Sequence, residues 1–264
     1  MISFAPMWAI VLRHMRMLRR DPNILLMLFY WPLLDIFIWG FVGKWIQQAQ
    51  TTQFHNYEAI AVLGVILWQI IGRGCNIMAA PLFEELSSNN VVNLFSLPLR
   101  ISEWIGGVLL YYIIIMLVTS AICICAIFML YDVSLWQILS TFLIFSPPLF
   151  FSGIWVGFIC LSIVVTLGKR GIELGFIAGW FLMPFSGAYY PIEVLPLWGQ
   201  TLSTYLPFSY VFQGMREYLM HQQNPTSYLI KGYILGIIYA AAAIIFFLYC
   251  FHRSKQKGLA RLTD

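Results

Sequence analysis

The sequence predicts an all-α integral membrane protein with six transmembrane helices, an N-terminal interfacial amphipathic helix and a re-entrant extracytoplasmic helical pair between spans five and six. Composition is the first reason: of 264 residues, 61% are hydrophobic and 10% are charged, whereas a soluble domain carries about 25% charge. The second reason is six apolar runs, since a helix needs about 20 residues to cross a bilayer. We therefore expect residues 1–264 to form one polytopic transmembrane domain.

The first element expected is a helix at residues 3–20. At 100° per residue, its arginines fall on one face and its apolar side chains on the other, as in helices that lie in the membrane interface. The alternative is a charged flank that only sets the orientation of the chain. The turn signal Asp21-Pro22-Asn23 ends this element. The six expected spans follow at about 24–45, 59–80, 104–130, 136–167, 172–190 and 229–251.

The positions of the basic residues predict the orientation. Six spans place both termini on one side, and 11 of the 15 Lys and Arg residues fall in segments on that side. The opposite side holds only Lys44, Arg216 and Lys231. By the positive-inside rule, both termini are expected in the cytoplasm.

A segment with helical spacing, residues 82–94, joins the second and third spans on the predicted cytoplasmic side. Two carboxylates stand near its start, where the dipole of a helix favours negative charge. A short helix held between two spans is suited to receive a push from a soluble partner, and a plain connecting loop is the alternative. The residues expected to transmit force are Glu84, Glu85, Leu86, Val91 and Leu94.

A proline-broken stretch, Met183–Arg216, separates the last two apolar runs, and we call it the outer segment because we expect it on the extracytoplasmic side. Its amphipathic pieces, Val194–Tyr205 and Ser209–Met220, are each too short to cross a bilayer. Broken backbone at membrane depth must pack against protein, because lipid cannot satisfy its polar groups. We therefore expect residues 191–220 to re-enter the extracytoplasmic face and to form an outer gate. The expected gate residues are Pro191, Glu193, Pro196, Trp198, Pro207 and Arg216.

The prolines of this stretch form a recognisable pattern: a Pro-x-Glu-x-x-Pro-x-Trp core at Pro191–Trp198, Leu-x-x-x-x-Pro at Leu202–Pro207, and a closing Arg216. The pattern resembles the signature region of permease subunits in type-2 ATP-binding-cassette exporters. The loop Glu84–Pro98 is similar to the coupling helix of that family. The resemblance implies a multi-pass permease domain in a bacterial cytoplasmic (inner) membrane. It also implies a homodimer, formed with a second copy of the chain.

The resemblance further implies an exporter that moves an amphipathic substrate outward from the cytoplasm or inner leaflet. A lipophilic drug, a lipid and a lipid-linked glycan all remain open as substrates. ATP and Mg are expected on the partner, an ATP-binding-cassette nucleotide-binding subunit present in two copies. This chain is expected to hold no cofactor and no metal, and to contact membrane lipids but no nucleic acid.

The residues agree that the ATPase is a separate subunit. A phosphate-binding loop has the form G-x-x-x-x-G-K-[ST]. The nearest candidate is Gly168-Lys169-Arg170, which has Ile163 at the first glycine position and Arg170 where the hydroxyl should stand. The chain is therefore not expected to be an enzyme.

Two ionisable residues lie inside expected spans, Asp35 in the first and Arg73 in the second. Charges in the membrane are costly and mark transport paths or paired groups. Asp35 is expected to line the path or pair with Arg73, and a purely structural hydrogen bond is the alternative. An ion-coupled secondary transporter that uses both charges is the competing function, although the inverted repeat of such folds is missing.

Aromatic residues near the ends of two spans are the other path candidates. Tyr30, Trp39, Phe185 and Tyr189 are expected to line a path between two copies, formed by the first, second and fifth spans. An interfacial aromatic belt explains several of the same positions. For Glu193 and Arg216 we expect an ion pair that holds the outer segment folded, with direct substrate contact as the alternative.

Overall fold

The computed structural model describes residues 4–49, 57–88, 90, 99–131 and 133–258, and all regular elements in these ranges are helical. The long helices are α1 (Phe4–Arg20), α2 (Pro22–Ala49), α3 (Tyr57–Ser87), α5 (Ile101–Leu130), α6 (Leu135–Leu167) and α10 (Thr226–Gln256). The shorter ones are η1 (Gly168–Arg170), α7 (Gly171–Phe181), η2 (Met183–Phe185), η3 (Ile192–Val194), α8 (Leu197–Thr204) and α9 (Pro207–His221). The expected all-α class is confirmed.

Four helical segments in the described ranges are long and apolar enough to cross a membrane. They are Tyr57–Ser87, Ile101–Leu130, Leu135–Phe185 and Thr226–Gln256. The chain is therefore a multi-pass membrane protein. The count of six spans stays a prediction. The first expected span corresponds to α2. This helix has 28 residues and a length of about 42 Å, which exceeds the thickness of the bilayer core.

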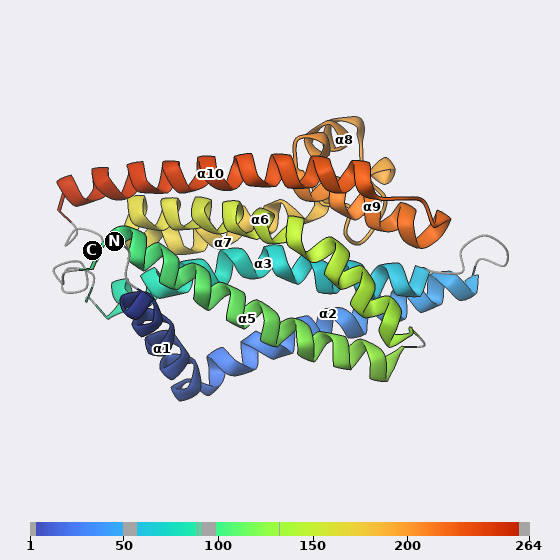
Figure 1. Cartoon of the computed structure of the whole chain (residues 1–264), viewed down its shortest axis with the longest axis horizontal. Helices are drawn as coiled ribbons and strands as arrows, with labels where there is room; N and C mark the ends of the chain where they lie inside the picture. The colour runs from blue at the N-terminus through green and yellow to red at the C-terminus, as the bar shows by residue number, and fades with distance from the viewer. Residues whose placement is uncertain (1–3, 50–56, 89, 91–98, 132, 259–264) are drawn as a thin grey trace.

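The long helices run side by side, and α1 crosses them obliquely near one end (Figure 1). The C-terminal end of α10 and the first turn of α5 lie at this end, whereas α8 and α9 lie toward the other (Figure 1). The end of α10 carries Arg253 and Lys255. The basic end of the bundle is thus well separated from the proline-broken segment (Figure 1). The side of the membrane on which each end lies stays a prediction.

α3 is the central helix of the bundle. Of its most apolar window, 83% is buried inside the protein, compared with 28% for α10. α3 and α6 touch backbone to backbone, because a Cβ on Gly74 would lie 2.2 Å from the carbonyl oxygen of Gly153. Small residues permit such close approach between membrane helices. α5 is connected to α3 by the Tyr112 hydroxyl, which donates to the carbonyl oxygen of Ile70 at 2.7 Å.

The fifth expected span is not a continuous helix as far as Tyr190, and that part of the prediction is wrong. α7 ends at Phe181 and is followed by the single 3₁₀ turn η2. Pro184 has no N–H to extend the helix, and its ring opposes helical continuation. The 11 residues of α7 reach about 16 Å, roughly half the hydrocarbon core of a bilayer.

The second expected span also has a different end. α3 does not stop near residue 80 but continues through Pro81 to Ser87. Leu82 and Leu86 are 1% and 0% exposed, and this burial offsets the backbone hydrogen bond that the proline removes. The residues expected to begin a separate coupling helix are therefore the last turns of α3.

Candidate functional site

Two acid–base contacts hold the last turns of α3 to α1. Glu85 Oε1 lies 2.5 Å from Arg13 Nη2, and Glu84 Oε2 lies 3.0 Å from His14 Nδ1. The Glu85 side chain is only 2% exposed. A buried carboxylate of this kind depends on its cation, since removal of one partner leaves an uncompensated charge. The two contacts, which we call the α1–α3 clamp, fix the end of α3 relative to α1.

Two further hydrogen bonds at the end of α3 involve the same two glutamates. Asn90 Nδ2 donates to Glu85 Oε2 at 2.7 Å, and the Ser88 hydroxyl donates to the carbonyl oxygen of Glu84 at 2.8 Å. Leu86 is fully buried. The other two expected force-transmitting residues, Val91 and Leu94, lie outside the described residues.

The sequence pointed to the two glutamates but not to their partners on α1. Arg13 was assigned to membrane headgroups and His14 to no site at all. The sequence did offer one indication of this pairing: the N-terminal helix is basic, the 82–94 segment begins with two glutamates, and both are predicted on the same side of the membrane. That signal selects no particular pair, because four arginines stand in the first 20 residues.

The intramembrane charges are held by neutral groups rather than by each other. Asp35 Oδ2 on α2 accepts a hydrogen bond from Gln69 Nε2 on α3, at 3.0 Å. Arg73 Nη2 donates instead to the backbone carbonyl of Leu28. In the ranges that the structure describes, no contact ion pair joins Asp35 and Arg73. Gln69 was missed by the sequence reasoning, although it stands one helical turn before Arg73.

Aromatic side chains join the outer segment to α2. Trp39, one turn after Asp35, contacts the ring of Tyr189 at 4.6 Å between centroids. The Tyr189 hydroxyl is buried, with no hydrogen-bond partner in the described part of the chain. Tyr30 is 50% exposed on α2, whereas Phe185 is buried. The four aromatic path candidates therefore do not form one surface.

Side chains from α8 and α9 satisfy the backbone where the fifth span breaks. The carbonyl oxygen of Phe185 accepts from the hydroxyls of Ser203 at 2.8 Å and Ser209 at 3.0 Å. The carbonyl oxygen of Gly187 accepts from Arg216 Nη2 at 2.8 Å. Irregular backbone at membrane depth needs such internal partners. These three bonds fold α8 and α9 back onto the residues that follow α7.

The ion pair expected between Glu193 and Arg216 is not formed as a contact among the described residues. Arg216 is 9% exposed and uses its guanidinium to hold Gly187, while Glu193 is exposed. Burial lowers the pKa of Arg216, and the nearby Glu193 carboxylate raises it. Glu193 and Arg216 thus interact electrostatically without contact. The hydrogen-bond acceptor of Arg216 is the Gly187 carbonyl and not the Glu193 carboxylate.

The remaining residues expected at the outer gate lie at or near helix ends. Pro191 precedes η3 and Pro196 precedes α8, both in extended conformation. Pro207 is the first residue of α9, where its missing N–H costs nothing. Trp198 is 66% exposed and contacts Phe185 edge-on, at 5.6 Å between ring centroids.

Comparison with known proteins gives one family. A family model described as ABC-2 type transporter matches residues 6–220. The match takes in both the α1–α3 clamp and the outer segment. No curated protein matches the chain.

Proposed function

Because the chain belongs to the ABC-2 type transporter family, we propose that it moves an amphipathic substrate outward when a separate nucleotide-binding subunit hydrolyses ATP. Membership makes the chain a transmembrane component of an ABC-type exporter. It is a permease-type component, not itself an ATPase, and it works with an ATP-binding subunit. ATP and Mg would bind to that partner. The ion-coupled alternative is not favoured, since the family match points to a different energy source.

The observation that carries the proposal is the α1–α3 clamp at the end of the most buried helix. A movement of Glu84 and Glu85 acts on the whole of α3, because a helix packed on all sides moves as a rigid element. About 30 Å further along α3, Gly64 contacts the outer segment: a Cβ there would lie 2.3 Å from the carbonyl oxygen of Ala188. α3 is therefore suited to carry a displacement from the clamp to the outer gate.

We further propose that two copies of the chain enclose the path, with α2 and α7 facing it, whereas α3, the third helix expected there, is buried within the bundle. α2 carries a row of exposed apolar and aromatic side chains: Tyr30, Trp31, Phe37, Ile38, Phe41 and Trp45. Asp35 lies on the same helix, but its carboxylate accepts a hydrogen bond from Gln69 on α3. The exposed face of α2 therefore suits the lipophilic body of an amphipathic substrate.

Charge reversal within the clamp tests the coupling. The chain would be co-purified with its nucleotide-binding subunit and reconstituted in vesicles, with ATP hydrolysis and the export of a fluorescent phospholipid or lipophilic dye measured together. We expect Glu85→Arg to reduce export at least tenfold while hydrolysis continues. The double variant Arg13→Glu/Glu85→Arg should regain much of the export, because the pair is restored with reversed signs.

The matched control is Arg19→Glu, which reverses a charge in the last turn of α1 outside the clamp. It should export like the unmodified protein. Normal export by Glu85→Arg would show that the end of α3 is only a connection between spans.

A further inference from the structure

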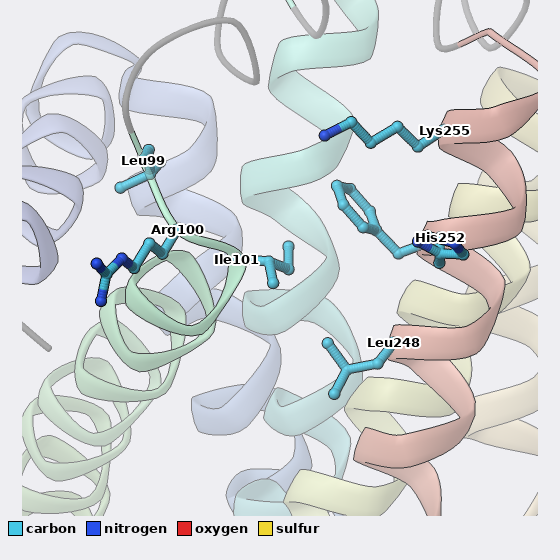
Figure 2. Close-up of a pocket in the computed structure, with 7 residues that line it drawn as sticks. Leu99, Arg100, Ile101, Leu248, His252 and Lys255 are labelled. Carbon is cyan, nitrogen blue, oxygen red and sulfur yellow. The ribbon is translucent and has the colours of Figure 1, made fainter. Parts of the chain in front are cut away.

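A groove opens between the first turn of α5 and the last turns of α10, at the basic end of the bundle (Figure 2). Its volume is about 530 Å³. Its walls combine apolar side chains with the cationic residues Arg100 and Lys255 and with His252. No carboxylate lines it among the described residues. This lining favours an anion that also carries an apolar part.

The α10 wall changes from apolar to basic along its length. Leu248, Phe251 and Lys255 stand three and four residues apart, so they share one helix face. Over about 10 Å this face passes from hydrocarbon to an ammonium group. Figure 2 shows Leu248 and Lys255 projecting from α10 toward Ile101 at the start of α5. An ordered gradient of this kind matches the acyl-to-headgroup boundary of a membrane leaflet.

Lys255 forms no salt bridge with the described part of the chain. The guanidinium of Arg100 points away from the groove in Figure 2, so Lys255 is the cationic group that the groove presents. Arg253 and Lys257 line a second groove on the α6 side of the same helix end. The end of α10 is therefore cationic on both sides.

We propose that the α5–α10 groove binds an anionic phospholipid of the inner leaflet. The phosphate lies at Lys255 Nζ, and an acyl chain packs against Ile101, Leu248 and Phe251. Basic pockets between membrane helices on the cytoplasmic side are suited to anionic headgroups. A soluble anion would gain nothing from the apolar wall, and a neutral lipid would gain little from the lysine. The inference rests on the proposed orientation of the bundle, but not on any transported substrate.

Binding of defined lipids to the full chain in detergent tests this site. Native mass spectrometry would count bound phosphatidylglycerol and phosphatidylcholine, and glycerol phosphate would serve as the free headgroup. We expect phosphatidylglycerol to bind in preference to the other two. Lys255→Gln should weaken its binding about fivefold, as expected for one basic residue near anionic lipid, and Lys255→Arg should retain it.

Lys257→Gln is the matched control, because it removes the same charge two residues away on the other side of α10. It should change phosphatidylglycerol binding at this site less than twofold. Equal loss in the two glutamine variants would reduce the effect to bulk charge and overturn the proposal. Equal binding of both lipids would show that the lipid charge has no effect and would overturn it as well. Binding of glycerol phosphate as tight as that of the lipid would overturn it too. None of these readouts requires transport.

Discussion

Arg216 on α9 donates a hydrogen bond of 2.8 Å to the backbone carbonyl of Gly187, 29 residues earlier in the chain. Gly187 stands at φ +74°, in a turn that only a residue without Cβ adopts readily. The contact joins the end of the outer segment to its beginning. It gives Arg216 a structural role in this segment, with its charge buried beside a backbone dipole.

Loss of the Arg216 guanidinium should therefore destabilise the outer segment. In Arg216→Met the carbonyl of Gly187 remains buried without its donor, at a cost of about 1–3 kcal/mol. Thermal unfolding of the detergent-solubilised protein would measure it. Glu193→Gln is the control, and it should change stability by less than about 0.5 kcal/mol. A larger loss in Glu193→Gln than in Arg216→Met would restore the ion pair as the main contact.

The contact between α3 and the outer segment predicts a marked difference between two glycines of one helix. Gly64→Ala places a methyl group against the carbonyl oxygen of Ala188, so the segment must shift, and we expect a loss of about 1–3 kcal/mol. At Gly72 the nearest atom to a new Cβ is 3.7 Å away. Gly72→Ala should be neutral or stabilising by up to about 1 kcal/mol. Equal effects on the unfolding temperature would contradict the close approach.

Tyr131, which follows α5, offers a test by pH. Its hydroxyl donates to the carbonyl oxygen of Ile36 at 2.8 Å, and burial raises its pKa to about 12, compared with about 10 in an unfolded chain. The neutral Tyr131 hydroxyl therefore makes its full contribution to the stability of the fold below about pH 10. That contribution is lost as the pH rises toward the folded-state pKa.

Tyr131→Phe should accordingly be less stable than the unmodified protein by about 0.5–1.5 kcal/mol at neutral pH. The difference should shrink between about pH 10 and pH 12, as followed by chemical denaturation. Tyr249→Phe is the control, because Tyr249 is 60% exposed on α10. A difference that does not depend on pH would show that ring packing alone holds Tyr131.

The hydrogen bond between Asp35 and Gln69 allows a test of whether the Asp35 carboxyl is structural or couples transport to ions. Asp35→Asn keeps an acceptor for Gln69, so we expect folding and ATP-driven export to remain within about twofold. Asp35→Leu leaves the Gln69 amide buried without a partner and should cost about 1–3 kcal/mol of stability. Export assays with ATP, with and without a proton gradient, would check this. Export that ends when the gradient is removed, and that Asp35→Asn abolishes, would favour the ion-coupled alternative.

The positions of two long helices followed closely from their apolar runs. The ends of α5 and α6 lie within a few residues of the expected ones, because long apolar runs between polar loops leave little choice. The stop at Asp21-Pro22 was likewise predictable, since α1 ends at Arg20 and α2 begins with proline. The sequence also located the outer segment, because its prolines and its short amphipathic pieces exclude a crossing helix.

Partners across helices were not predictable in the same way. The same chemistry allowed Arg216 to pair with Glu193, and Asp35 with Arg73. The structure instead gives each charged group a neutral partner that lies closer, the Gly187 carbonyl and Gln69. Composition and charge by themselves determined that this chain is a helical membrane protein with one basic end. Only tertiary packing decided where Pro81 is tolerated, where α7 stops and which groups meet, because these depend on distances between segments that periodicity does not contain.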